Sequence, residues 1–69
     1  MAQFAVVLKD QEWTVFRDAE PVRTFLTRSA AVEAAEALAF GAEEQGEPVE
    51  LVIQDYYGSV AEKHSGRPV

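Results

Sequence analysis

Hydrophobic and polar positions alternate in several short segments of this chain and repeat with a helical period in one longer segment. Alternation predicts half-buried strands, whereas recurrence at every third or fourth residue predicts an amphipathic helix. The strands are expected at residues 4–8, 13–16, 22–26, 49–53 and 59–63, and the helix at residues 28–44. The predicted order is therefore β-β-β-α-β-β.

The first two strands are expected to form a hairpin because their alternation continues across a short polar break at Asp10-Gln11. A two-residue loop there would place Leu8 opposite Trp13, and the same register puts Val6 opposite Val15 and Lys9 opposite Glu12. The loop lacks the glycine that a tight primed turn prefers, so a longer loop with a shifted register is the alternative.

The third strand follows a break that ends at Pro21, since proline cannot donate to a strand ladder. The simplest register divides its side chains between the two faces of the sheet. Thr24 and Leu26 would then share a face with Trp13 and Val15, and Arg23 and Phe25 would share the other face with Thr14 and Phe16.

The helix has recognisable ends and one apolar side. Thr27 is placed to act as the N-cap, and Gly46 followed by Pro48 is typical of a helix end. Its apolar side is rich in alanine, which allows close packing on a sheet, and consists of Ala31, Val32, Ala35, Leu38, Ala39 and Ala42.

These elements predict an α+β fold with a mainly antiparallel sheet of four or five strands and one helix packed on one face. The fourth strand is expected to return parallel to either the first or the third strand. A single domain is expected over residues 1–64, followed by a flexible tail at residues 65–69.

One helix can cover only one face of the sheet, so the second face must either tolerate contact with solvent or be covered by a partner. A contact surface is therefore predicted at Val7, Phe16, Phe25 and Val52 on the second sheet face, with Phe40 on the outer side of the helix. The expected partner is a second copy of the chain in a two-fold homodimer, although another protein partner would also satisfy the pattern.

The composition narrows the range of functions. The chain of 69 residues has no cysteine, one histidine and a formal net charge of −6. A chain this short buries only about 60% of the surface of its unfolded form, so association would add useful stability. The absence of cysteine fits the cytoplasm, and no apolar segment is long enough for a signal peptide or a membrane span.

A nucleic-acid-binding module is the alternative function. Lys9, Arg17 and Arg23 are interspersed with aromatic residues on the first three strands. Acidic residues interrupt them, and the second half of the chain carries all of the excess negative charge, which repels phosphates. Nucleic acid is therefore the less favoured partner.

Catalytic, cofactor and metal sites are not expected. His64 has no residue nearby in sequence that would orient it as a base, and the carboxylates of Glu43, Glu44, Glu47 and Glu50 fit a solvated surface better than a cation loop. The serines lack a nucleophile motif, the glycines form no phosphate loop, and Tyr56 and Tyr57 flank a turn. The chain is expected to be non-enzymatic.

The pattern resembles a family of short bacterial proteins of uncharacterised function. The resemblance covers roughly residues 4–64 and depends on Trp13-x-Val15, Thr27 before Ala31-Val32-x-x-Ala35, Leu51-Val52-Ile53 and Gly58-x-Val60-x-Glu62-Lys63. Members commonly have a glycine before the tryptophan and an Asp-Gly turn between the last strands, where this chain has Glu12 and Tyr57-Gly58. The resemblance implies a β-meander, a helix and a closing hairpin, and no activity.

Overall fold

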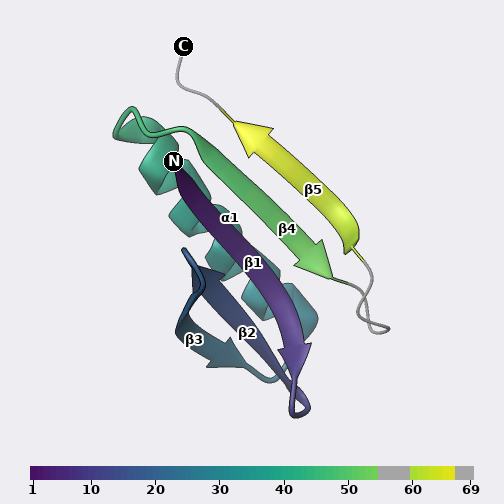
Figure 1. Ribbon diagram of the computed structural model, residues 1–69. Coiled ribbons are helices and arrows are strands. Elements are labelled where there is room, and N and C mark those ends of the chain that lie inside the picture. The colour runs from purple at the N-terminus through teal and green to yellow at the C-terminus, as the bar shows by residue number, and fades with distance from the viewer. Residues whose placement is uncertain (55–59, 67–69) are drawn as a thin grey trace.

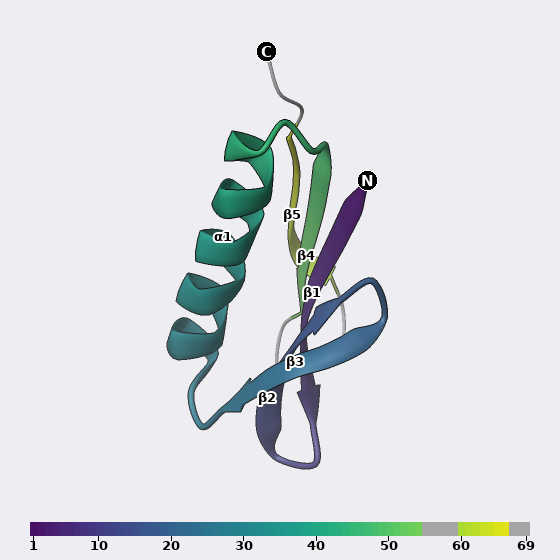
Figure 2. The ribbon, with the colours of Figure 1, turned by 90° about the vertical axis from the view of Figure 1, so that its left-hand side faces the viewer.

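The computed structural model describes residues 1–54 and the backbone of residues 60–66. The elements are β1 (Ala2–Lys9), β2 (Glu12–Arg17), β3 (Glu20–Phe25), α1 (Arg28–Glu44), β4 (Val49–Gln54) and β5 (Val60–Gly66). The strands form one sheet in the order β3-β2-β1-β4-β5, and α1 lies along one face of it (Figure 1; Figure 2). The predicted α+β fold is confirmed.

The central strand of the sheet is β1, which pairs with β2 on one side and with β4 on the other. Its pairing with β4 is parallel, and the remaining pairings are antiparallel. The backbone N–H of Ala2 donates to the carbonyl oxygen of Pro48 at 2.9 Å, which ties the start of β1 to the loop before β4. The fourth strand therefore returns beside the first strand, one of the two predicted neighbours.

The β1–β2 hairpin has the two-residue turn and the register that the alternation predicts. Leu8 lies opposite Trp13, and Val6 lies opposite Val15. Asp10 and Gln11 have φ angles of 50° and 66°, so both adopt the left-handed conformation that a type I′ turn requires without using glycine. The alternative of a longer loop is not observed.

The predicted register of β3 is wrong. Phe16 lies opposite Pro21, but Val15 lies opposite Arg23, so Val22 is an extra residue in a β-bulge. Beyond the bulge every side chain is moved to the other face, and Phe25 lies opposite Trp13 on the helix side.

The boundaries of β3 also differ from the prediction. The strand begins at Glu20 and ends at Phe25, and Leu26 follows it with 87% of its surface exposed. Leu26 is therefore not part of the face beneath the helix.

Both ends of α1 are formed as expected from the sequence. The Thr27 hydroxyl accepts a hydrogen bond from the backbone N–H of Ala30 at 3.3 Å. At the other end Gly46 has a φ angle of +82°, and its N–H donates to the Glu43 carbonyl at 2.9 Å. The Glu47 N–H donates to the Ala42 carbonyl at 3.0 Å, which completes a Schellman motif.

The core lies between α1 and the sheet, and the buried residues on its helix side are all alanines. They are Ala31, Ala35, Ala39 and Ala42. Larger side chains come from the strands, namely Phe4, Val6, Trp13, Val15, Val49, Leu51 and Ile53. Val32 packs at the margin of this core, but Leu38, which was expected inside, is 37% exposed because it faces the β3 side of the helix.

The last strand is longer than predicted. It extends from Val60 to Gly66 and pairs antiparallel with β4. The expected turn at Tyr57-Gly58 lies outside the described residues. The sheet therefore has five strands, at the upper end of the predicted range.

Candidate interaction surface

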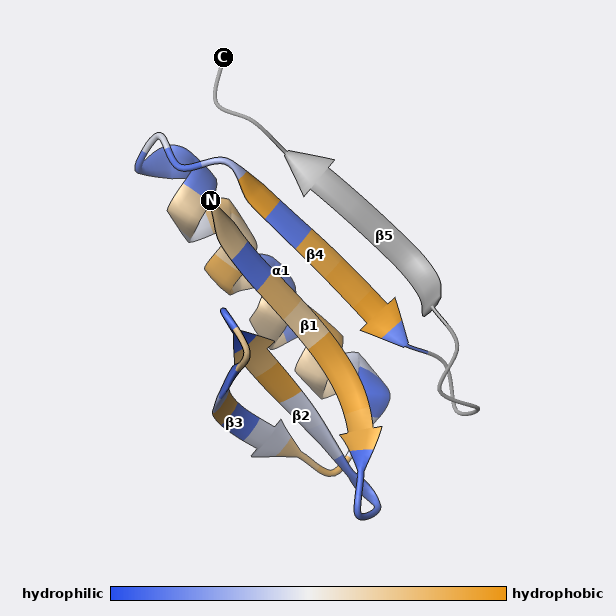
Figure 3. Ribbon diagram, viewed as in Figure 1, coloured by the Kyte–Doolittle hydropathy of each residue, from blue (hydrophilic) through white to orange (hydrophobic). Residues whose placement is uncertain are grey.

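The candidate surface is the side of the sheet that faces away from α1, which we call the open face. Because side chains alternate along a strand, β1, β2 and β4 each contribute residues to it at every second position. Its apolar centre consists of Ala5 and Val7 from β1, Phe16 from β2 and Val52 from β4. Figure 3 views the sheet from this side and shows apolar residues gathered along its central strands.

The apolar centre is partly buried by neighbouring side chains of the same sheet. Val7, Phe16 and Val52 each keep an intermediate exposure, whereas their counterparts under the helix are almost completely buried. Thr14 is the exception on the open face, with only 5% of its surface exposed. Thr14 lies between Val7 and Thr24 on the neighbouring strands, and the rest of the face remains in contact with solvent.

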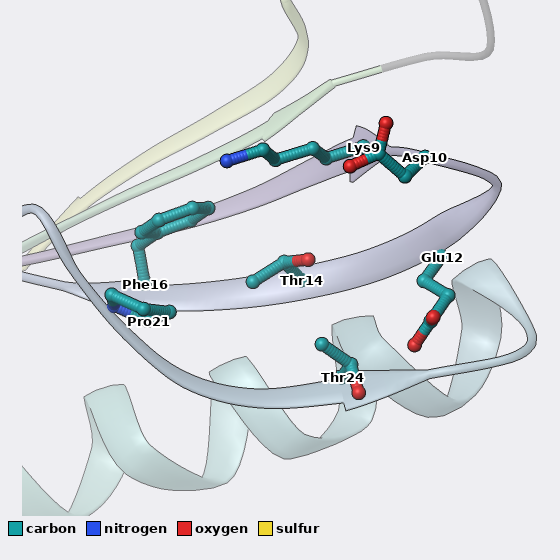
Figure 4. A pocket seen from close by; sticks show the side chains of 7 residues that line it. All are labelled: Lys9, Asp10, Glu12, Thr14, Phe16, Pro21 and Thr24. Carbon is teal, nitrogen blue, oxygen red and sulfur yellow. The ribbon is translucent and has the colours of Figure 1, made fainter.

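Two shallow hollows lie on the open face and share Phe16. One has a volume of about 310 Å³ and is lined mainly by Ala5, Val7, Phe16 and Val52. The other, of about 330 Å³, is lined by Thr14, Phe16, Pro21 and Thr24 and by three charged residues, Lys9, Asp10 and Glu12. Figure 4 shows the Lys9 side chain extending in the direction of Phe16, with Thr14 between the two ends of this second hollow.

Among residues 1–54, the charged residues of the open face lie at its two ends. Lys9 and Glu12 are paired at the end where β1 finishes. Glu50 pairs with Gln3 at the end where β1 begins. The centre is therefore apolar and the ends are polar, as in protein interfaces with a polar rim.

Two of the predicted contact residues do not belong to this surface. Phe25 lies on the helix side, where it is partly buried against the core and the Arg23 guanidinium sits 5.1 Å from its ring centroid. Phe40 is 55% exposed, as predicted, but it lies on the outer side of α1 and thus in the other layer of the molecule. The structure brings together only Val7, Phe16 and Val52 from the predicted set.

The basic residues of the meander do not gather on one surface. Arg17 and Arg23 lie on the helix side, opposite Phe4 and Val15 respectively, whereas Lys9 lies on the open face. The guanidinium of Arg17 is 5.5 Å from the Phe4 ring centroid and forms an ion pair with Glu47 at 3.4 Å. This arrangement does not favour a nucleic-acid interface.

A further groove, which the sequence reasoning missed, runs between β3 and α1. It has a volume of about 370 Å³ and is lined by Val15, Val22, Arg23, Ala34, Ala37 and Leu38. Val22 is 51% exposed there because it is the extra residue of the bulge. The sequence does contain an indication of this groove, because Ala34 and Ala37 leave this flank of the helix without long side chains.

Comparison with known families gives a match that covers nearly the whole chain. Residues 4–66 match DUF2188, described as an uncharacterised protein conserved in bacteria. The chain belongs to this family. Searches of the curated proteins and of the solved structures found no match.

Membership in DUF2188 confirms the resemblance that the sequence showed, and the family description assigns no activity. Within residues 1–54, no group of three or more histidine, cysteine, aspartate or glutamate residues is arranged to hold a metal ion. The part of the chain that the structure describes also includes no helix long and apolar enough to cross a membrane.

Several residues considered in the sequence of this DUF2188 member cannot be placed. Tyr56, Tyr57 and Ser59 lie outside the described residues. His64 belongs to β5, of which only the backbone is described.

Proposed function

We propose that this chain is a small non-enzymatic protein that associates with a second copy of itself through the open face. The observation that supports this is the contiguous apolar centre of Val7, Phe16 and Val52 on a sheet face that α1 does not cover. Sheets bury such faces either against a helix layer or against another sheet. The proposed setting is the cytoplasm, in keeping with the lack of cysteine.

The size of the open face is sufficient for a weak interface. Five strands about 4.8 Å apart and about 20 Å long cover roughly 480 Å² of sheet on each copy. Two such faces together bury about 1,000 Å², which is near the lower limit for a specific protein interface. A specific dimer formed through this face therefore requires the two sheets to overlap fully.

The exposed apolar area sets the expected strength of association. Because Phe16 is already partly buried, covering the remainder of its ring contributes about 1 kcal/mol, less than burial from a fully exposed state. Val7 and Val52 add smaller amounts for the same reason. We expect a dimer with a dissociation constant between roughly 10 µM and 1 mM.

Sedimentation velocity over a dilution series tests the proposal. The wild-type chain should change from dimer to monomer between about 1 mM and about 10 µM, and Phe16→Glu should remain monomeric at every concentration because it places a charge in the apolar centre. Phe40→Glu is the matched control, since it makes the same change on the outer side of α1 and should leave association unchanged.

Two results would contradict the proposal. One is a wild-type chain that sediments as a monomer throughout the series. The other is a dimer that survives Phe16→Glu but is lost in Phe40→Glu, which would place the interface on the helix instead.

A further inference from the structure

The groove between β3 and α1 combines an apolar lining with a charged side chain. Its volume of about 370 Å³ lies in the range of small-molecule sites, which runs from about 300 to about 1,000 Å³. Val22 and Leu38 line it and remain 51% and 37% exposed, so their apolar surface is available to a ligand. The groove lies on the helix side of the sheet and is therefore separate from the open face.

The charged side chain of this lining is Arg23. Among residues 1–54 it forms no hydrogen bond or ion pair, whereas Arg17 and Arg28 each have an oxygen acceptor. The strand β5, of which only the backbone is described, lies at the opposite edge of the sheet, with three strands between it and β3 (Figure 1). The charge of Arg23 is therefore available to an anion.

No acidic side chain of the described residues lines the groove. The helix contributes Ala34, Ala37 and Leu38 to the lining, and the cross-strand neighbour of Arg23 on β2 is Val15. The exposed glutamates of α1 lie outside this lining. The groove therefore places one positive charge beside an apolar surface.

The ring of Phe25 holds the Arg23 guanidinium in place. The guanidinium carbon lies 5.1 Å from the ring centroid, and Phe25 is itself packed against the core. The N–H donors of a guanidinium lie in its plane, so a contact with an aromatic ring is compatible with two parallel hydrogen bonds to a carboxylate. An anion therefore meets a cation that is already positioned, which lowers the entropy cost of binding.

We infer that this groove binds a small-molecule carboxylate, with its apolar body against Val22 and Leu38 and its carboxylate on Arg23. A protein segment that adds a strand to β3 fits less well, because Pro21 has no N–H to donate and the bulge at Val22 interrupts the ladder. The same features oppose the pairing of β3 with β3 of a second copy. The inference is independent of the proposed homodimer, which uses the other face of the sheet.

Titration with hydrocinnamate at neutral pH, followed by two-dimensional proton–nitrogen NMR, tests the site. A ligand of about eleven non-hydrogen atoms is expected to bind with a dissociation constant of about 1 mM. The amide signals of Val22, Arg23 and Leu38 should shift and reach saturation. Hydrocinnamyl alcohol, which has the same apolar body without the charge, should bind about fivefold more weakly, since a charge-assisted contact at an exposed arginine contributes modestly.

Two variants with the same change in net charge separate a specific contact from a general attraction of anions. Arg23→Gln should weaken the binding of hydrocinnamate about fivefold and leave that of the alcohol unchanged, because the apolar lining is kept. Lys9→Gln removes one positive charge from the open face and should leave both affinities unchanged.

Several results would overturn the inference. One is the absence of saturable shifts well above the expected dissociation constant, and another is a set of shifts centred on Val7 and Phe16, which would place the ligand on the open face. Equal affinities for the carboxylate and the alcohol would remove the role of Arg23. Shifts at Val22 and Leu38 on dilution of the protein alone would assign the groove to a second copy. Tighter binding of the peptide acetyl-Ala-Ala-Val, which has a free carboxylate, would assign it to the end of a protein chain.

Discussion

Gly41 and Gly46 allow the same chemical change to be made in two backbone conformations. A Cβ atom added at either position would meet no atom of the surrounding residues within 4 Å, so the two sites differ only in the local backbone conformation. Gly41 lies within α1, whereas Gly46 has a φ angle of +82° just beyond it. We expect Gly41→Ala to stabilise the fold by about 0.5–1 kcal/mol, and Gly46→Ala to destabilise it by about 1 kcal/mol.

The measurement is thermal and urea unfolding followed by circular dichroism at one fixed protein concentration, since association shifts apparent stability. For a domain of this size, 1 kcal/mol corresponds to a change of about 4–8 °C in Tm. The two variants should therefore move Tm in opposite directions. A neutral or stabilising Gly46→Ala would refute the left-handed helix end and the Schellman motif that depends on it.

Two further substitutions test the turn and the helix packing. Ala19 has a φ angle of 69° in the β2–β3 turn, so Ala19→Gly should stabilise the chain by about 0.5 kcal/mol in urea unfolding, and a loss of stability would argue against a left-handed backbone at this position. Ala35→Leu should destabilise the chain by about 1–3 kcal/mol because Ala35 is fully buried against the sheet. Ala37→Leu is its control, because Ala37 is exposed at the edge of the open groove between β3 and α1, and an equal loss in both variants would contradict the close helix–sheet contact.

The sequence predicts most of the fold wherever short-range rules decide the structure. The β1–β2 register follows from alternation across Asp10-Gln11, because a two-residue turn fixes which residues face each other. The bounds of α1 follow from Thr27 and Gly46, whose capping roles depend only on neighbouring backbone groups. Neither inference requires knowledge of the tertiary contacts.

The register of β3 could not be obtained in the same way. Assigning alternate residues of β3 to the two faces, starting from the Asp18-Ala19 turn, assumes an unbroken strand ladder. The bulge at Val22 interrupts that ladder. One extra residue reverses the faces of the rest of the strand, so Phe25 was assigned to the wrong side. The position of Phe25 on the helix side depends on tertiary packing. Its aromatic ring fills space next to Trp13 that the alanines of α1 leave empty.

The position of Phe25 also changes the expected strength of self-association. Alternation alone predicted two phenylalanines on the open face, enough exposed apolar area for folding and association to be linked. With Phe25 under the helix, Phe16 is the one large apolar side chain that residues 1–54 retain on the open face, and that ring is partly buried. The bulge therefore moves apolar area from the proposed interface to the core. We expect a folded monomer in equilibrium with a weak dimer, and not an obligate dimer.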